Sequence, residues 1–169
     1  MKVITFLTLM LVALVSMTSC SSDDQESFRE WTYTGNNILT IDKEYDPVEI
    51  TCKVTQRENG TIEVEMPEYQ LNGTTIGNLT IGAVTIKNIM YNTETGSYYR
   101  MFGKDGLTMH FKAEGGHGAM DNDYAFTEDS YIDVKQSTNG VIILLNYSFG
   151  KMPMRIISRF EVAVAKDEE

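Results

Sequence analysis

The sequence predicts an all-β domain, built as an antiparallel meander that closes into a barrel or folds into a sandwich. Three observations lead to this prediction. Apolar and polar residues alternate in several short segments, turn-forming residues separate those segments, and no window carries an apolar stripe of helical spacing. Segments that recur about 10 to 14 residues apart and are joined by tight turns are typical of antiparallel barrels and sandwiches.

The alternation is clearest over residues 48–55, where Val48, Ile50, Cys52 and Val54 share one parity. A strand with this pattern packs one face against the core and leaves the other face in water. The same pattern returns in residues 61–66, 107–113 and 154–164. These four segments are therefore predicted to be strands of a sheet with one buried face.

Turn formers lie between the predicted strands, and Asn-Gly in particular favours the positive φ angles of tight hairpins. They are Asn59-Gly60, Asn72-Gly73, Thr95-Gly96, Lys104-Asp105-Gly106 and Asn139-Gly140. The division gives the predicted strands 31–41, 48–56, 61–71, 77–90, 97–103, 107–114, 130–137, 141–149 and 153–165. Residues 141–145 are apolar on both faces, which predicts a central strand or one covered on its outer side. Residues 115–129, rich in glycine and acids, are expected to form a long connecting loop.

The N-terminus has the features of a signal peptide. Lys2 supplies a positive charge, an apolar run covers residues 3–15, and small and polar residues lead to Cys20. The run is shorter than the roughly 20 apolar residues that a membrane-spanning helix needs. Residues 14–20 resemble a lipobox, which directs a diacylglycerol onto the cysteine and cleavage in front of it. We therefore expect residues 1–19 to be removed and lipid on Cys20 to anchor the protein to a membrane.

The polar run after Cys20 predicts a tether. Residues 20–30 are expected to be a lipidated flexible spacer, and residues 31–165 the folded domain. Asp23-Asp24 resembles the acidic signal that sends lipoproteins of Bacteroidetes to the outer face of the outer membrane. This resemblance implies display at the cell surface, with an anchor facing the periplasm as the alternative. If Cys20 is not lipidated, the alternative is an ordinary secreted protein.

The net charge and the number of cysteines limit the classes of partner and the chemistry that we expect. The chain has a net charge of −10, and removal of residues 1–19, which contain Lys2 and no acid, leaves −11. Such an acidic surface disfavours nucleic acid and anionic membrane surfaces as partners, because both are bound by clustered Lys and Arg. With Cys20 acylated, Cys52 has no intramolecular partner. Its place in an alternating strand predicts a buried small hydrophobic residue rather than a nucleophile.

Several short segments resemble the calycin-like β-barrel domains, a family with many lipoproteins of the Bacteroidetes type. They are Tyr33-Thr34-Gly35, the turn Asn59-Gly60-Thr61, the stretch Glu68-Tyr69-Gln70-Leu71 and the segment Ile76-Gly77-Asn78-Leu79-Thr80-Ile81. The resemblance covers nearly all of residues 31–165. It implies a lipocalin-like, up-and-down barrel of about eight antiparallel strands that holds a small ligand. It carries over no catalytic residues.

Motifs for catalysis or cofactor binding are missing from the sequence. It has no G-x-S-x-G elbow, no Cys–His motif and no glycine-rich phosphate loop. Glu63 and Glu65 share a strand face and would hydrolyse glycosides only across a cleft. His117, Asp121 and Asp123 could meet around a cation, but the segment lacks the regular oxygen spacing of a calcium loop. A solvated acidic loop, no metal site, no cofactor and no enzymatic activity are therefore expected.

Aromatic side chains are the candidates for ligand contacts. Most should fill the core, but an eight-stranded barrel is also just wide enough to hold one small ligand. The candidates for lining an open mouth are Trp31, Tyr33, Tyr99, Phe111 and Tyr147. The leading hypothesis is a surface-tethered, non-enzymatic barrel that binds a small apolar or amphipathic ligand in an interior cavity of several hundred Å³. The alternative is a filled barrel whose loops or outer face bind a protein or glycan, which requires an exposed apolar or aromatic patch.

Overall fold

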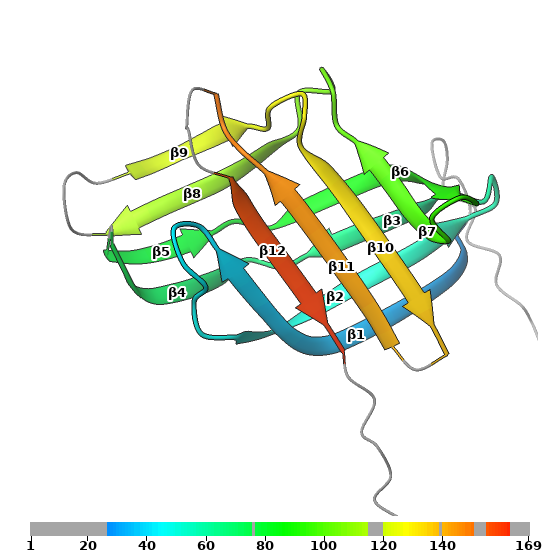
Figure 1. Ribbon diagram of the computed structural model, residues 1–169, viewed down its shortest axis with the longest axis horizontal. Coiled ribbons are helices and arrows are strands. Elements are labelled where there is room, and N and C mark those ends of the chain that lie inside the picture. Colours follow the sequence, from blue (N-terminus) through cyan, green and yellow to red (C-terminus); the bar gives the residue numbers. More distant parts are fainter. Residues whose placement is uncertain (1–26, 76, 115–119, 139, 151–154, 163–169) are drawn as a thin grey trace, which may run out of the picture.

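The computed structural model describes residues 27–75, 77–114, 120–138, 140–150 and 155–162 (Figure 1). Outside these ranges lie the expected signal peptide 1–19, Cys20, Asp23-Asp24, Ile76, His117, Asn139, Met154 and Val164. Every element in the described ranges is a β-strand, so the predicted all-β class is confirmed. Among these residues there is no helix of the length and hydrophobicity that crossing a bilayer requires.

Twelve strands follow one another in the described part of the chain. They are β1 (Ser27–Thr40), β2 (Val48–Arg57), β3 (Ile62–Met66), β4 (Tyr69–Thr74), β5 (Gly77–Ile81), β6 (Val84–Asn92), β7 (Ser97–Met101), β8 (Thr108–Glu114), β9 (Met120–Ala125), β10 (Tyr131–Ser137), β11 (Gly140–Tyr147) and β12 (Ile156–Glu161). Eight of them form a closed barrel in the order β1-β12-β11-β10-β7-β6-β3-β2. The other four form a separate sheet in the order β4-β5-β8-β9.

The barrel and the four-stranded sheet are made from the same passes of the chain. β3 leads into β4 and β5 into β6 through short breaks, whereas β7 leads into β8 through residues 102–107 and β9 into β10 through residues 126–130. One half of each pass pairs in the closed barrel and the other half pairs in the second sheet. All the pairings are antiparallel and join neighbouring passes, with β1 and β12 closing the ring. The fold is therefore an eight-pass, up-and-down barrel whose four middle passes bend outward at one end, which we call the flared sheet (Figure 1).

The bends occur where the sequence weakens strand pairing. Pro67 lies between β3 and β4 and has no backbone N–H to donate to a neighbouring strand. Gly82 lies between β5 and β6, where a Cβ would approach the Cβ of His110 to 2.8 Å. The Gly82 amide donates to the His110 carbonyl oxygen at 2.7 Å, so the missing side chain permits a close contact with β8. Gly35 on β1 likewise permits the close approach of β12 that closes the barrel. A Cβ at Gly35 would lie 2.5 Å from the Glu161 carbonyl oxygen of β12.

The interior of the closed barrel is filled with side chains. The predicted alternation in β2 is confirmed, because Ile50, Cys52 and Val54 are all buried. Burial raises the pKa of the Cys52 thiol to about 12, which agrees with a core residue and not a nucleophile. Large side chains that are almost fully buried come from most strands of the barrel, including Leu39, Ile62, Ile86, Ile132, Ile143, Leu145, Tyr147 and Phe160.

A few buried polar groups share the barrel interior. Ser158 interrupts the apolar parity of β12, and its hydroxyl donates to the Asn37 side-chain oxygen at 2.8 Å. Tyr69 hydrogen-bonds to both of these residues, and burial raises its pKa to about 12. The Asn37 Nδ2 and the Tyr147 hydroxyl have no hydrogen-bond partner among the described residues. These orphaned groups belong to the filled barrel.

Two expectations about the strands need correction. The predicted loop over 115–129 contains β9, which pairs with β8 through six residues. It was missed because Asp121, Asn122 and Asp123 are exposed on an edge strand that buries little apolar surface. The prediction of a central strand over residues 141–145 is confirmed, because β11 lies between β10 and β12; Ile142 on its outer face is 38% exposed. β1 begins at Ser27, which lies inside the predicted tether of residues 20–30.

Candidate ligand-binding pocket

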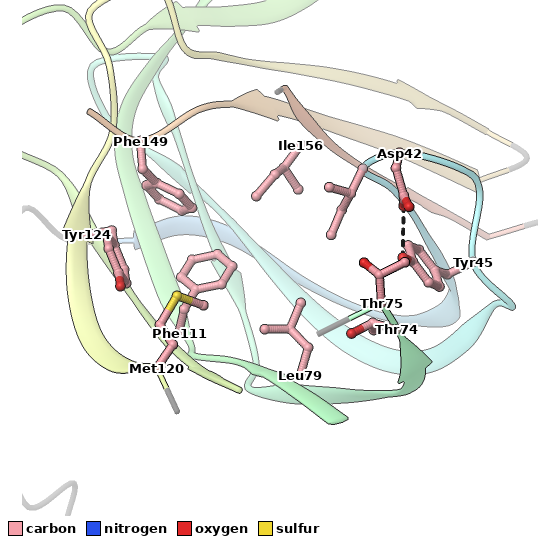
Figure 2. A pocket seen from close by; sticks show the side chains of 11 residues that line it. Asp42, Tyr45, Thr74, Thr75, Leu79, Phe111, Met120, Tyr124, Phe149 and Ile156 are labelled. Carbon is pink, nitrogen blue, oxygen red and sulfur yellow. Dashed lines mark hydrogen bonds between the residues drawn. The ribbon is translucent and has the colours of Figure 1, made fainter. Parts of the chain in front are cut away.

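An apolar pocket of about 180 Å³ lies where the flared sheet leaves the closed barrel (Figure 2). The lining residues come from the β1–β2 connection, the inner face of the flared sheet and the two ends of the β11–β12 connection. They are Ile41, Asp42, Tyr45, Thr74, Thr75, Leu79, Phe111, Met120, Tyr124, Phe149 and Ile156. The pocket is therefore assembled from segments at one end of the barrel.

The bends in the four middle passes explain why a space exists at this end. In the closed barrel, inward side chains from opposite strands meet and fill the interior. In the flared sheet, Leu79 on β5 and Phe111 on β8 point inward from strands that have tilted away. Both side chains are 2% exposed, so the sheet presents a continuous apolar wall to the pocket.

Aromatic rings and a thioether form one side of the pocket (Figure 2). Phe111 and Phe149 make an edge-to-face contact with ring centroids 4.6 Å apart, and Tyr124 lies 5.4 Å from Phe149. Met120 borders this group from β9, and its flexible thioether adapts to different neighbours. Such a surface favours a flat apolar group over a polar one.

Oxygen atoms form the opposite side, beside the β1–β2 connection (Figure 2). The Tyr45 hydroxyl donates to Asp42 Oδ1 at 2.8 Å, and the Lys43 amide donates to the same oxygen at 3.0 Å. The bond from Tyr45 lowers the pKa of Asp42, so its carboxyl is ionised at neutral pH. Burial, together with the bond to Asp42, raises the pKa of Tyr45, which keeps its proton. The Thr74 hydroxyl donates to the Gly77 carbonyl oxygen.

The β1–β2 connection is folded tightly against the pocket. The Tyr45 amide donates to the Leu39 carbonyl oxygen at 2.9 Å, and the Ile41 amide donates to that of Lys43 at 3.1 Å. Tyr45 is 8% exposed and separates the apolar pocket from a polar groove between residues 43–48 and 70–73. The oxygen side of the pocket is thus held in place by backbone hydrogen bonds.

The size of the pocket limits what it can hold. It is smaller than the several hundred Å³ expected, and it lies beside the closed barrel and not inside it. An apolar cavity of about 150 Å³ in another protein stays dry and binds benzene or xenon. A pocket of about 180 Å³ therefore suits one ring or a short branched chain, and is too small for an extended acyl chain.

The structure does not gather the five predicted ligand residues in one place. Phe111 lines the pocket, and Tyr147 lies behind it with its ring 5.4 Å from that of Phe149. Trp31 and Tyr33 are on β1 and pack half-buried against the core, and Gln136 of β10 donates to the Tyr33 hydroxyl oxygen at 3.2 Å. Their strand positions are near the β2–β3 and β10–β11 turns, at the end opposite the pocket.

Tyr99 lies on another surface. It is on the outer face of β7, half-buried, with its ring 5.5 Å from that of Tyr131. Sequence reasoning missed most of the pocket because Ile41, Tyr45 and Phe149 are in connections between strands. Their approach to Phe111 depends on the bends in the sheet. Pro67 and Gly82 were the available signals for those bends.

The aspartates that were considered for a cation have a different partner. On the outer face of the flared sheet, Asp123 Oδ1 lies 2.8 Å from His110 Nδ1, and Asp121 Oδ1 lies 3.1 Å from His110 Nε2. The bond to Asp123, aided by Asp121, raises the pKa of His110. In the described part of the chain, no group of three or more His, Cys, Asp or Glu side chains is arranged to hold a metal ion. The trio instead ties β9 to β8.

Comparison with known families agrees with this architecture. The family model of the calycin-like β-barrel domain matches residues 30–160, which is most of the chain. The closed, up-and-down barrel of eight passes is the fold that this match leads one to expect. The chain therefore belongs to the calycin-like β-barrel domain family. No curated protein and no solved structure matches the chain.

Proposed function

We propose that this protein is a lipid-anchored, cell-surface binding protein that captures a small apolar or amphipathic ligand in the pocket at the flared end. The observation that carries the proposal is the joint presence of a filled barrel and a separate apolar pocket beside it. The chain buries side chains throughout the closed barrel, yet at the flared end aromatic and aliphatic groups line open space. An apolar pocket with a few polar groups at one side is a typical small-molecule site.

The position of the N-terminal strand fits a tethered receptor. Ser27 pairs with Arg57, next to the β2–β3 turn, whereas the pocket lies at the end that carries the flared sheet (Figure 1). A lipid on Cys20 would therefore attach near the end of the barrel opposite the pocket. In that orientation the pocket faces away from the membrane and is accessible to ligands in the surrounding medium.

A non-enzymatic role without nucleic-acid partners is part of the proposal. Among the described residues of the pocket lining, Asp42 is the one carboxylate, and Tyr45 hydrogen-bonds to it. His110 lies on the outer face of the flared sheet, away from the pocket. Among the described residues of the lining, no second ionised group stands beside Asp42 to share a proton transfer with it, which favours binding over acid–base catalysis. The net charge of −10 works against binding to phosphate backbones.

Native mass spectrometry of the purified protein, before and after solvent extraction, tests the binding role directly. We expect a reproducible extra mass that extraction removes, or binding of added toluene. Ile41→Trp should abolish binding because the indole occupies the pocket, whereas Ile142→Trp, which adds the same group to the outer face, should not. Equal binding by both variants would place the ligand elsewhere.

Anchoring and display are tested in cells. Cys20→Ala should abolish incorporation of labelled fatty acid and release the protein from the membrane fraction. Protease added to intact cells should degrade the wild-type protein if it is displayed on the surface. Protection of the protein until the outer membrane is opened would instead indicate an anchor that faces the periplasm.

A second candidate function rests on the outer face of the closed barrel. Met90 and Met101 are 65% and 56% exposed, and Met90 pairs with Tyr99 while Met101 pairs with Tyr131. This exposed Met–Tyr patch is the kind of surface by which a filled barrel would bind a protein or glycan. Met90→Lys with Met101→Lys should abolish such binding and leave toluene binding intact.

A further inference from the structure

The chemistry of the oxygen side defines which ligands the pocket accepts. Resting on the proposed function, we infer that the pocket selects compact apolar amines, with a ring against the aromatic side and a donor group beside Asp42. The apolar lining alone does not distinguish a neutral ligand from an amine or an acid of the same size. The preference for an amine follows from which protons of the oxygen side already form hydrogen bonds within the protein.

The hydroxyl protons of Tyr45 and Thr74 on this side already form hydrogen bonds within the protein. Tyr45 donates to Asp42, and Thr74 donates to the Gly77 carbonyl oxygen. Asp42 itself is ionised and has no proton to give. The side therefore presents acceptor oxygens to a ligand, and a ligand that enters must supply the donor.

Charge adds to this preference. The Asp42 carboxylate lies at the rim of the pocket, and it repels a carboxylate on a ligand and attracts an ammonium group. Lys43 is the neighbouring cation, but it lines the polar groove on the other side of Tyr45, with Nζ 5.2 Å from the centre of the Tyr45 ring. A fatty acid would thus meet unfavourable groups at the oxygen side as well as too little space for its chain.

Four ligands of similar size distinguish the effect of ligand polarity on affinity from the effect of burying an apolar ring. They are toluene, benzyl alcohol, benzylamine and benzoate, titrated into the protein while the methyl signals of Ile41, Leu79 and Ile156 are followed by NMR. Because Asp42 is exposed to solvent, we expect benzylamine to bind only about three- to tenfold more tightly than toluene. Benzyl alcohol should fall between them, and benzoate should bind most weakly.

Asp42→Asn tests the carboxylate with little change in shape. The variant should lower benzylamine affinity to that of benzyl alcohol and leave toluene affinity unchanged. Asp46→Asn is the matched control, since it makes the same charge change in the same connection but lines the groove and not the pocket. Should Asp42→Asn fail to fold, added salt should weaken wild-type binding of benzylamine but not of toluene.

The outcomes distinguish the inference from the proposed function. Equal or tighter binding of toluene or benzoate at these methyl groups would overturn the inference and leave the proposed function standing. If none of the four ligands moves the methyl signals, the proposed function itself fails for this pocket. An equal loss of benzylamine affinity in the Asp46 variant would also overturn the assignment to Asp42.

Discussion

The closed barrel and the flared sheet share the four middle passes of the chain, yet their inward-facing side chains are packed differently. In the closed barrel, Ile132, Ile143 and Phe160 are fully buried in the core. In the flared sheet, Leu79 and Phe111 are equally buried but border the pocket. One pass of the chain can therefore stabilise the fold with one half and provide a binding surface with the other half.

The difference follows from where the strands bend. Pro67 and Gly82 separate the two halves of the passes that they interrupt, so the flared half is free to tilt. The tilt leaves inward side chains without partners on the far wall. The β1–β2 connection, through Ile41 and Tyr45, covers part of that surface and completes the pocket.

Truncation of one buried side chain in each region should give the largest difference in the free energy of unfolding. Ile143→Ala removes atoms that are packed on all sides, and we expect it to cost about 4 kcal/mol of unfolding free energy. Leu79→Ala should cost about 2 kcal/mol, because that side chain borders existing space on one side. Denaturant unfolding of both variants measures the difference. Equal losses would show that the pocket is closed in solution.

Substitution of two buried tyrosines, Tyr147 on β11 and Tyr69 at the start of β4, should change the free energy of unfolding with opposite signs. Tyr147→Phe removes a buried hydroxyl that has no partner among the described residues, and should stabilise the protein by up to about 1 kcal/mol. Tyr69→Phe removes bonds to Ser158 and Asn37, and should destabilise it by about 1 kcal/mol. Thermal and denaturant unfolding provide both values. Destabilisation by Tyr147→Phe would mean that its hydroxyl has a partner in solution.

The flared sheet should respond locally to pH through His110. Its pKa is raised by Asp123 and Asp121, so the protonated form stabilises the contact between β8 and β9. This stabilisation is fully present below the ordinary value of 6.5 and is lost as pH rises through the folded-state pKa. Hydrogen exchange of β9 amides, corrected for intrinsic rates, should therefore quicken as the pH rises above 6.5 through the folded-state pKa. His110→Gln should remove the pH dependence, and an unchanged profile in that variant would assign it to another group.

The sequence predicted the closed barrel better than the flared sheet, for a physical reason. The alternation of Ile50, Cys52 and Val54 reflects a strand with one packed face, and such a strand is recognisable without knowledge of its partners. β9 was not predicted because Asp121 and Asp123 are exposed around His110, so the strand has little apolar periodicity.

The pocket was still harder to predict from sequence. Phe111 was a candidate because it is aromatic and lies in a clear strand, but Ile41, Tyr45 and Phe149 lie in connections. Trp31 and Tyr33 were equally good candidates by composition, and they lie at the other end of the barrel. The end at which an inward aromatic residue lies depends on strand register and bends, which a single alternating pattern does not specify.

A crystal structure under xenon pressure tests the central comparison most directly, because xenon occupies apolar space of this size. The account predicts one strong xenon site between Phe111, Phe149 and Leu79, none within the closed barrel, and loss of that site in Ile41→Trp. Xenon bound between Ile143 and Val54 inside the closed barrel, with none beside Phe111, would contradict the account.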